Sequence, residues 1–176
     1  ILCDKVIIDD KSAAYDAVQS LINAGKRKIA LVTTVDYVSF GKLRTDGYTK
    51  ALLDNDIPFT EDLIIKIEDI ENCEVKISQL IKDSAIDAVF AVNELFAVIS
   101  IKTANNHGLR VPEDLSVIAF TDGIISMYST PTITTVSQDG IKMGRKAAMM
   151  LIARLESEEN DEEEQYKTEV IETHLV

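Results

Sequence analysis

The sequence predicts an α/β fold in which a mostly parallel, doubly wound sheet has helices on both faces. Short apolar runs alternate with longer amphipathic segments along nearly the whole chain, and this alternation is typical of parallel strands joined by right-handed crossovers. Several of the short runs are continuously apolar, as expected for strands that are covered on both faces. Turn residues separate the segments: Gly108 can end a helix in the left-handed conformation, and Pro112 prevents that helix from resuming.

Two strands and two helices are expected in the first third of the chain. Residues 6–8 form a short apolar strand, Ser12 is positioned to cap the helix after it, and Gly25 ends that helix. Residues 29–32 are continuously apolar, which indicates a buried strand. A polar loop follows, and a helix is then expected over 40–55.

The middle of the chain repeats this order. Residues 64–67 form a short strand, and 71–84 form a helix because Cys73 and Ile77 fall on one apolar stripe with residues of the next turn. Residues 86–92 form the next strand, and 95–107 the next helix.

The last third contains a strand, an extended segment, a helix and a terminal strand. Residues 115–120 are almost continuously apolar and predict a buried strand. Residues 132–136 are extended, and 141–155 form an amphipathic helix. The remaining residues with strand character are 168–176.

Composition is that of an ordinary globular protein with a strongly acidic balance. The chain has 176 residues, 46% of them hydrophobic and 27% charged, which fits one domain or parts of two. Its net charge of -12 argues against nucleic-acid binding by this chain, because phosphate contacts need clustered Lys and Arg. Residues 156–164 hold seven carboxylates, which predicts a solvated loop; the alternative is an acidic segment that binds a metal or a partner.

Several classes of function have no support in the sequence. The two cysteines, Cys3 and Cys73, and the two histidines fall in no pattern of a zinc site or a disulfide framework. We find no G-x-S-x-G elbow, no G-x-G-x-x-G after a strand and no P-loop. No apolar run approaches the roughly 18 residues that a membrane span needs. We therefore expect no enzyme, no metal, no cofactor and no membrane partner.

Polar residues follow the predicted strands at the edge of the sheet where ligands bind. In an open parallel sheet, the binding crevice lies outside the carboxyl ends of the strands. Carboxylates and amides there suit hydrogen bonds to vicinal hydroxyls, and Arg44 adds a rigid fork of donors. The polar residues at these ends are Asp9, Asn93, Glu94, Thr121, Asp122 and Gln138, together with the loop 33–39.

Each of these positions has a simpler alternative explanation. Asn93 and Glu94 would only begin a helix, and Asp122 with Gly123 would only form a turn. The agreement of several positions favours the binding interpretation for the set as a whole.

Five segments, in their order along the chain, resemble the effector-domain pattern of the lactose/galactose-repressor (LacI/GalR) family of bacterial transcription regulators. They are AGKRKIA at 24–30, RTDGYTKAL at 44–52, AVFAVNELFA at 88–97, GLRVPEDLSVIAFTD at 108–122, and PTITTVSQ at 131–138 followed by Gly144. Their order and their coverage of almost the whole chain argue against chance agreement. Two letters depart from the family pattern: Glu94 stands where the pattern has aspartate, and Thr121 replaces the first aspartate of its F-D-D element.

The resemblance implies a periplasmic-binding-protein-like fold with two subdomains, of which the first is only partly present. Residues 1–8 would end the amino-terminal subdomain, and 9–136 would form the carboxyl-terminal one. Residues 137–165 would be a return helix and acidic loop of the amino-terminal subdomain, and 166–176 a terminal strand that crosses back. The chain opens without Met and with an apolar run, so we expect it to begin inside a strand. We also expect the family's helix-turn-helix DNA-binding domain to be absent from this chain.

The resemblance also implies a function: the effector-binding and dimerisation domain of a cytoplasmic LacI-type regulator. Such a domain senses a small molecule, here a sugar or a related metabolite, and controls operator DNA binding through a domain missing from this chain. The implied effector-binding residues are Asp9, Arg44, Asn93, Glu94, Thr121, Asp122 and Gln138. The implied homodimer interface contains Leu95, Val98, Ile99, Ile125, Met127 and Tyr128; the alternative is that these apolar side chains pack within the chain.

Two other functions share this fold. The first is a periplasmic sugar-binding protein of a transport system, which the VPEDLSV and PTITTVSQ elements disfavour. The second is an enzyme on the same scaffold, which the lack of a nucleophile–base arrangement disfavours.

Overall fold

In the part of the chain that the computed structural model describes (residues 2–35, 39–121, 123–156 and 166–176), six strands form the main sheet. Their spatial order is β3-β2-β4-β5-β6-β8. The first five are parallel to one another, and β8 pairs with β6 in the antiparallel direction. The strands are β2 (Ile29–Thr34), β3 (Ile64–Ile67), β4 (Ala88–Ala91), β5 (Ser116–Phe120), β6 (Thr134–Ser137) and β8 (His174–Leu175). The predicted mostly parallel sheet is therefore confirmed.

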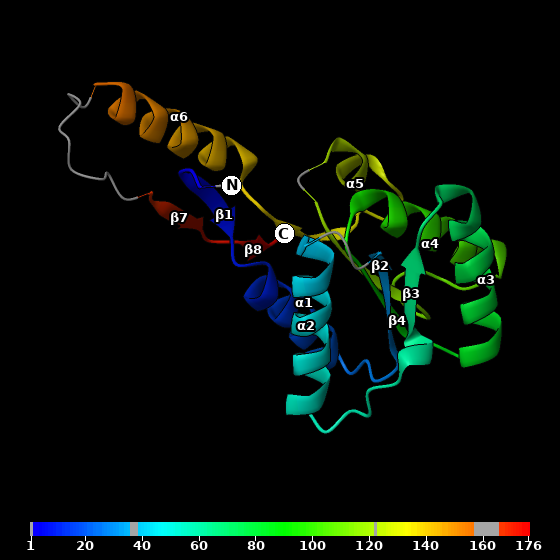
Figure 1. Ribbon diagram of the computed structural model, residues 1–176. Coiled ribbons are helices and arrows are strands. Elements are labelled where there is room, and N and C mark those ends of the chain that lie inside the picture. Colours follow the sequence, from blue (N-terminus) through cyan, green and yellow to red (C-terminus); the bar gives the residue numbers. More distant parts are fainter. Residues whose placement is uncertain (1, 36–38, 122, 157–165) are drawn as a thin grey trace.

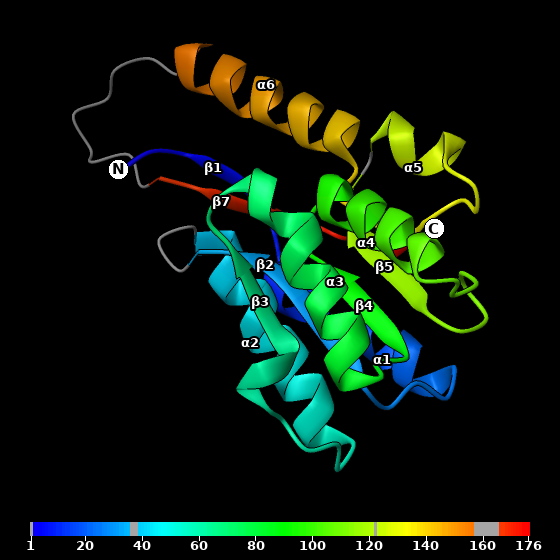
Figure 2. The same ribbon diagram turned by 90° about the vertical axis from the view of Figure 1, so that its right-hand side faces the viewer.

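Helices cover both faces of this sheet, as the alternation of segments predicts. Figures 1 and 2 show α1 (Asp10–Asn23) and α2 (Ser39–Asp54) on one face, and α3 (Cys73–Ser84) and α4 (Glu94–Asn106) on the other. Short 3-10 turns at Glu61–Leu63 and Ile70–Asn72 flank β3. The segment after β5 that carries Ile125, Met127 and Tyr128 of the predicted interface is a short helix, α5 (Ile124–Tyr128).

The α1–α2 pair depends on one glycine. A Cβ placed on Gly47 would lie 2.3 Å from the backbone oxygen of Lys11 and 2.8 Å from the Cβ of Ala14. Only glycine therefore allows the two helix backbones to approach this closely. The close approach matters because α1 begins beside the carboxyl ends of the strands and α2 carries Arg44 there.

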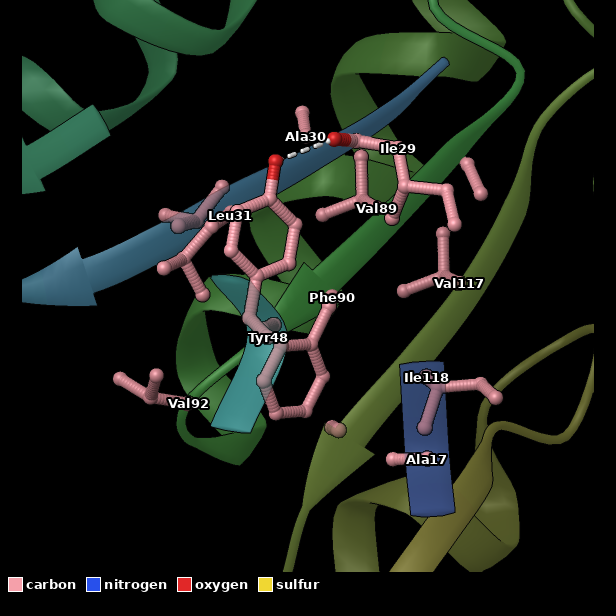
Figure 3. Close-up of a cluster of buried hydrophobic side chains, with 14 of the residues drawn as sticks. Ala17, Ile29, Ala30, Leu31, Tyr48, Val89, Phe90, Val92, Val117 and Ile118 are labelled. Atoms are coloured by element: carbon pink, nitrogen blue, oxygen red, sulfur yellow. Dashed lines mark hydrogen bonds between the residues drawn. The ribbon is translucent and has the colours of Figure 1, made fainter. Parts of the chain in front are cut away.

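The core lies between the sheet and its helices and is almost entirely apolar. All residues of β4 are buried, as are the first five of β2, which is why both strands are continuous apolar runs in the sequence. Tyr48 brings a polar atom into this core, and its hydroxyl donates a hydrogen bond to the Ile29 carbonyl oxygen at 2.8 Å (Figure 3). Burial raises the pKa of Tyr48 far above its ordinary value of 10.0. The Tyr48 hydroxyl consequently stays protonated and keeps donating its hydrogen bond to the Ile29 carbonyl oxygen.

The strand order places a switch point beside β2. The chain leaves β2 through α2 to reach β3 on one side, and then returns through α3 to β4 on the other side of β2. Strands β2 and β4 are in register from Ile29 opposite Ala88 to Val32 opposite Ala91. In doubly wound sheets, ligands bind where the strand order reverses in this way.

A second, smaller layer lies to one side of the main sheet. Strands β1 (Lys5–Ile8) and β7 (Thr168–Ile171) pair in parallel, and α6 (Gly140–Glu156) packs beside them (Figure 1). Arg154 on α6 forms a double hydrogen bond with the Asp4 carboxylate, Nε to Oδ2 at 2.6 Å and Nη2 to Oδ1 at 2.9 Å. The backbone N–H of Lys167 donates to the same carboxylate at 2.7 Å. One side chain therefore joins the end of α6 to both sides of the small sheet.

Two local predictions were wrong. Asp9, and not Ser12, caps α1: the Asp9 carboxylate accepts a hydrogen bond from the Ser12 backbone N–H at 3.0 Å, and the helix begins at Asp10. The single terminal strand expected over 168–176 is two strands, because the chain leaves the small sheet after Ile171 and joins the main sheet as β8. The subdomain boundaries near residues 9, 137 and 166 stay predictions.

Of the helices in the described residues, none combines the length and the apolar character that crossing a membrane would require.

Candidate functional site

Arg44 lies at the switch point and is held by two hydrogen bonds and an ion-pair contact. Its Nη1 donates to the carbonyl oxygen of Val92, at the end of β4, at 2.6 Å. Its Nε donates to Oδ1 of Asp10, the first residue of α1, at 2.7 Å, and Nη2 lies 2.7 Å from the same oxygen. Arg44 is only 6% exposed. The side chain therefore ties α1, α2 and β4 together at the predicted binding edge.

Two aromatic rings fix the plane of the guanidinium. The Arg44 Cζ atom lies 3.7 Å from the ring centroid of Phe120 and 4.9 Å from that of Phe40. Such contacts add cation–π attraction and leave the fork of N–H groups little rotational freedom. Burial lowers the pKa of Arg44, and the Asp10 carboxylate acts in the opposite direction. An arginine keeps its charge under these conditions, so the site contains a rigid, charged donor.

Two threonine hydroxyls beside this site lack partners. The Oγ1 atoms of Thr33 and Thr34, at the end of β2, are buried and have no hydrogen-bond partner among the described residues. A Cβ on Gly41 would lie 2.4 Å from the Thr34 hydroxyl, which places both threonines against the first turn of α2. A buried hydroxyl without a partner costs about 1–3 kcal/mol. In the sequence, both residues belong to the polar loop 33–39; two hydroxyls at the end of an apolar strand were the signal that could have singled them out.

Asn93 and Thr121 lie at the ends of the neighbouring strands and are partly engaged. Asn93 Oδ1 accepts a hydrogen bond from the Phe96 backbone N–H at 2.9 Å and so caps α4. Thr121 Oγ1 accepts one from the Gly123 backbone N–H at 2.6 Å. Each has the cap or turn role that the simpler alternative gives it. The Asn93 amide nitrogen has no hydrogen-bond partner in the described part of the chain, so it is available to a ligand.

The remaining predicted site residues differ in position. Asp9 is exposed and caps α1. Gln138 is half-buried and follows β6 at the same edge of the sheet. Glu94 is directed towards α5, where its Oε1 accepts a hydrogen bond from the Ser126 backbone N–H at 2.8 Å. The prediction for Asp122 lies outside the described residues.

The predicted dimer residues fall on two adjacent elements, the first turns of α4 and the short helix α5. Val98 and Ile99 are half-buried and pack against the core. The other four are exposed: Leu95 at 48%, Ile125 at 51%, Met127 at 70% and Tyr128 at 78%.

One cavity lies away from this edge. It is about 680 Å³, lies between α3 and α4, and contains Ser78 and His107 in its lining. Ser78 Oγ and His107 Nε2 are 2.7 Å apart. The described residues provide no carboxylate hydrogen-bonded to His107, so this pair lacks the third member of a catalytic triad.

Comparisons with known proteins agree with this fold. A family model described as "periplasmic binding protein-like domain" matches residues 18–176. The transcriptional regulator CelR of Thermobifida fusca is 31% identical over 173 residues, which are 97% of this chain and 50% of that protein. The chain spans about half the length of the curated relatives it matches.

Solved structures give the same result. A complex of the transcriptional regulator CelR with cellobiose has a TM-score of 0.87 at 29% identity, covering 99% of this chain and 53% of the other. A sugar-binding LacI-family regulator from Escherichia coli, complexed with phosphate, has a TM-score of 0.83 at 28% identity, covering 97% and 60%. The chain therefore belongs to the LacI/GalR family of transcriptional regulators and has the periplasmic-binding-protein-like fold of their effector domains.

Proposed function

We propose that the chain is the effector-binding and dimerisation domain of a cytoplasmic LacI-type regulator, in which a sugar or related metabolite controls operator DNA binding. The observation that carries the proposal is the position of Arg44 at the switch point between β2 and β4, with its guanidinium in contact with the rings of Phe40 and Phe120. A rigid donor fork suits the hydroxyl edges of a polyhydroxylated ring, and the Phe40 ring, which is 38% exposed, offers an apolar face to its C–H groups.

The arrangement of the two sheets supports allosteric control. The chain passes between them three times, after β1, after β6 and after β7. Asp10, the partner of Arg44, lies two residues beyond the first of these crossings. A ligand held at this junction and contacting both sides binds one relative placement of the sheets better than another, and that difference in affinity shifts their equilibrium.

The relatives named above are regulators, which favours this function over a periplasmic sugar-binding protein of a transport system and over an enzyme. Cellobiose is the first compound to test, because the CelR structure contains it.

Calorimetric titration of the full-length protein with cellobiose, glucose, ribose and adenine tests the proposal. We expect at least one compound to bind, and to change operator affinity in a gel-shift assay. Arg44→Lys keeps the charge but loses the planar fork, so it should weaken binding by at least about tenfold. Arg145→Lys, on the exposed surface of α6, is the matched control. Ligand affinity unchanged by Arg44→Lys would contradict the assignment of the site.

A further inference from the structure

Arg44 is the only buried charged side chain among the described residues, and its counter-ion belongs to the protein. Asp10 Oδ1 lies 2.7 Å from both Nε and Nη2, and the Asp10 side chain is itself 14% exposed. A guanidinium and a carboxylate in this geometry form a neutral pair. The charge of Arg44 is therefore already compensated before any ligand arrives.

The pair leaves Arg44 able to donate but not to attract an anion. A guanidinium has five N–H groups. One on Nε, one on Nη1 and one on Nη2 are used by Asp10 and Val92. The second N–H on each of Nη1 and Nη2 has no partner among the described residues. These two remaining donors of a neutral pair suit acceptor oxygens of a neutral ligand, such as hydroxyls.

The other charges at this edge strengthen the bias against anions. Among the described candidate residues, Asp9, Asp10 and Glu94 are acidic, and Arg44 is the one cation. The amino end of α1 would itself attract an anion, but Asp9 caps it through Ser12. Lys11 and Lys42, in the first turns of α1 and α2, are exposed, where solvent and salt screen them.

We infer that Asp10 makes this a site for neutral polyhydroxylated ligands and discriminates against their phosphorylated or carboxylated analogues. The inference rests on the proposed function and specifies its ligand class. An anionic group placed on the free N–H groups of Arg44 would lie beside the Asp10 carboxylate and would have to displace it. A hydroxyl meets no such repulsion.

Matched pairs of ligands test this inference. The full-length protein is titrated calorimetrically with glucose and glucose 6-phosphate, with cellobiose and its 6′-phosphate, and with inorganic phosphate alone. The neutral member of a pair that binds should bind at least about tenfold more tightly than its phosphate. Asp10→Asn keeps the size and one oxygen acceptor but removes the charge, so it should reduce this ratio at least about tenfold. Asp16→Asn, an exposed aspartate on the same helix, should leave the ratio as in the wild type.

The outcomes separate the inference from the proposed function. A phosphate that binds the wild type as tightly as its parent sugar overturns the inference and leaves the function standing. A discrimination ratio that Asp10→Asn does not change also overturns it. If Asp10→Asn does not fold, as circular dichroism would show, the wild-type pairs still decide the ligand class. Binding of no compound, neutral or anionic, contradicts the proposed function instead.

Discussion

The carboxylate of Glu94, at the first position of α4, accepts a hydrogen bond from the backbone N–H of Ser126 in α5 at 2.8 Å. This contact joins the two elements that carry the exposed apolar side chains of the predicted interface. It fits only because residue 123 is a glycine, since a Cβ there would lie 2.2 Å from Glu94 Oε2. Glu94, which is longer than the aspartate of the family pattern, and Gly123, which has no side chain, therefore depend on each other.

Gly123→Ala tests this relationship. The backbone φ of Gly123 is -74°, so alanine introduces no backbone strain and only the clash with Glu94. The Glu94 carboxylate can move aside, because it is the end of a flexible side chain, but it then loses its hydrogen bond to Ser126. We expect a loss of about 0.5–1.5 kcal/mol in the free energy of unfolding, measured by urea denaturation. The loss should be smaller in a Glu94→Ala background, where the clashing carboxylate is absent. Gly140→Ala, where an added Cβ meets nothing within 4 Å, is the control. Equal effects at both glycines would show that the contact with Glu94 is not the cause.

Tyr48→Phe tests the hydrogen bond that Tyr48 makes within the core. The substitution removes the donor to the Ile29 carbonyl oxygen and leaves that oxygen buried. We expect a loss of about 1–3 kcal/mol in unfolding free energy, read from the midpoint of denaturation at constant m-value. Tyr128→Phe, at a side chain that is 78% exposed, should change stability by less than about 0.5 kcal/mol. A stable Tyr48→Phe variant would mean that the carbonyl finds another donor.

Met127→Lys tests the proposed dimer. Met127 on α5 is 70% exposed, and a charge at the centre of an apolar interface disfavours association without affecting the monomer core. We expect sedimentation velocity to show a shift from dimer to monomer at micromolar concentration. Val75→Lys places the same charge at a 64% exposed position on α3 and should leave the dimer intact. A dimer that survives Met127→Lys would locate the interface elsewhere.

Asp4 makes the stability of the small layer depend on pH, and this stability falls as the pH is lowered. The side-chain hydrogen bond from Arg154, followed by the backbone hydrogen bond from Lys167, lowers the pKa of Asp4 from 3.8 to about 2. Because the folded-state pKa lies below the unfolded one, the stabilisation is complete above about pH 4 and is lost as the pH falls towards 2. Urea denaturation between pH 5 and pH 2 should therefore show a shallower acid decline for Asp4→Asn than for the wild type. Asp16→Asn, which removes an exposed carboxylate outside this contact, should retain the wild-type slope.

Much of the fold was predictable because the core imposes its pattern directly on the sequence. The strands at 29–32 and 86–92 were predicted because burial on both faces requires a continuous apolar run. The structure shows them as Ile29–Thr34 and Ala88–Ala91. Helix α2 was predicted over 40–55 and begins one residue earlier, at Ser39.

The failures occurred where local sequence is compatible with two structures. Asp9 and Ser12 are equally good helix caps. The hydrogen bond from the Ser12 backbone N–H to the Asp9 carboxylate identifies Asp9 as the cap. The terminal segment has the same extended pattern in either sheet, so nothing local could divide it at residue 172. Helix α5 has five residues, too few for a helical period to be visible.

The places of the candidate site residues in the fold were predictable, but the contacts among these residues were not. Strand ends and the family pattern placed Arg44 at the carboxyl edge of the sheet, where the structure has it. Its partner Asp10 is 34 residues away in the sequence, and the pairing arises only when α1 and α2 pack together. Sequence spacing likewise could not reveal that Glu94 is directed to α5, because that depends on the space above Gly123.

The split of the terminal segment also limits how the two layers can be arranged. Between Ile171, the last residue of β7, and His174, the first of β8, lie only Glu172 and Thr173. Three fully extended steps span no more than about 10 Å. The short connection therefore holds the end of the small sheet close to the edge of the main sheet. The two sheets can rotate about this point, but they cannot move apart there.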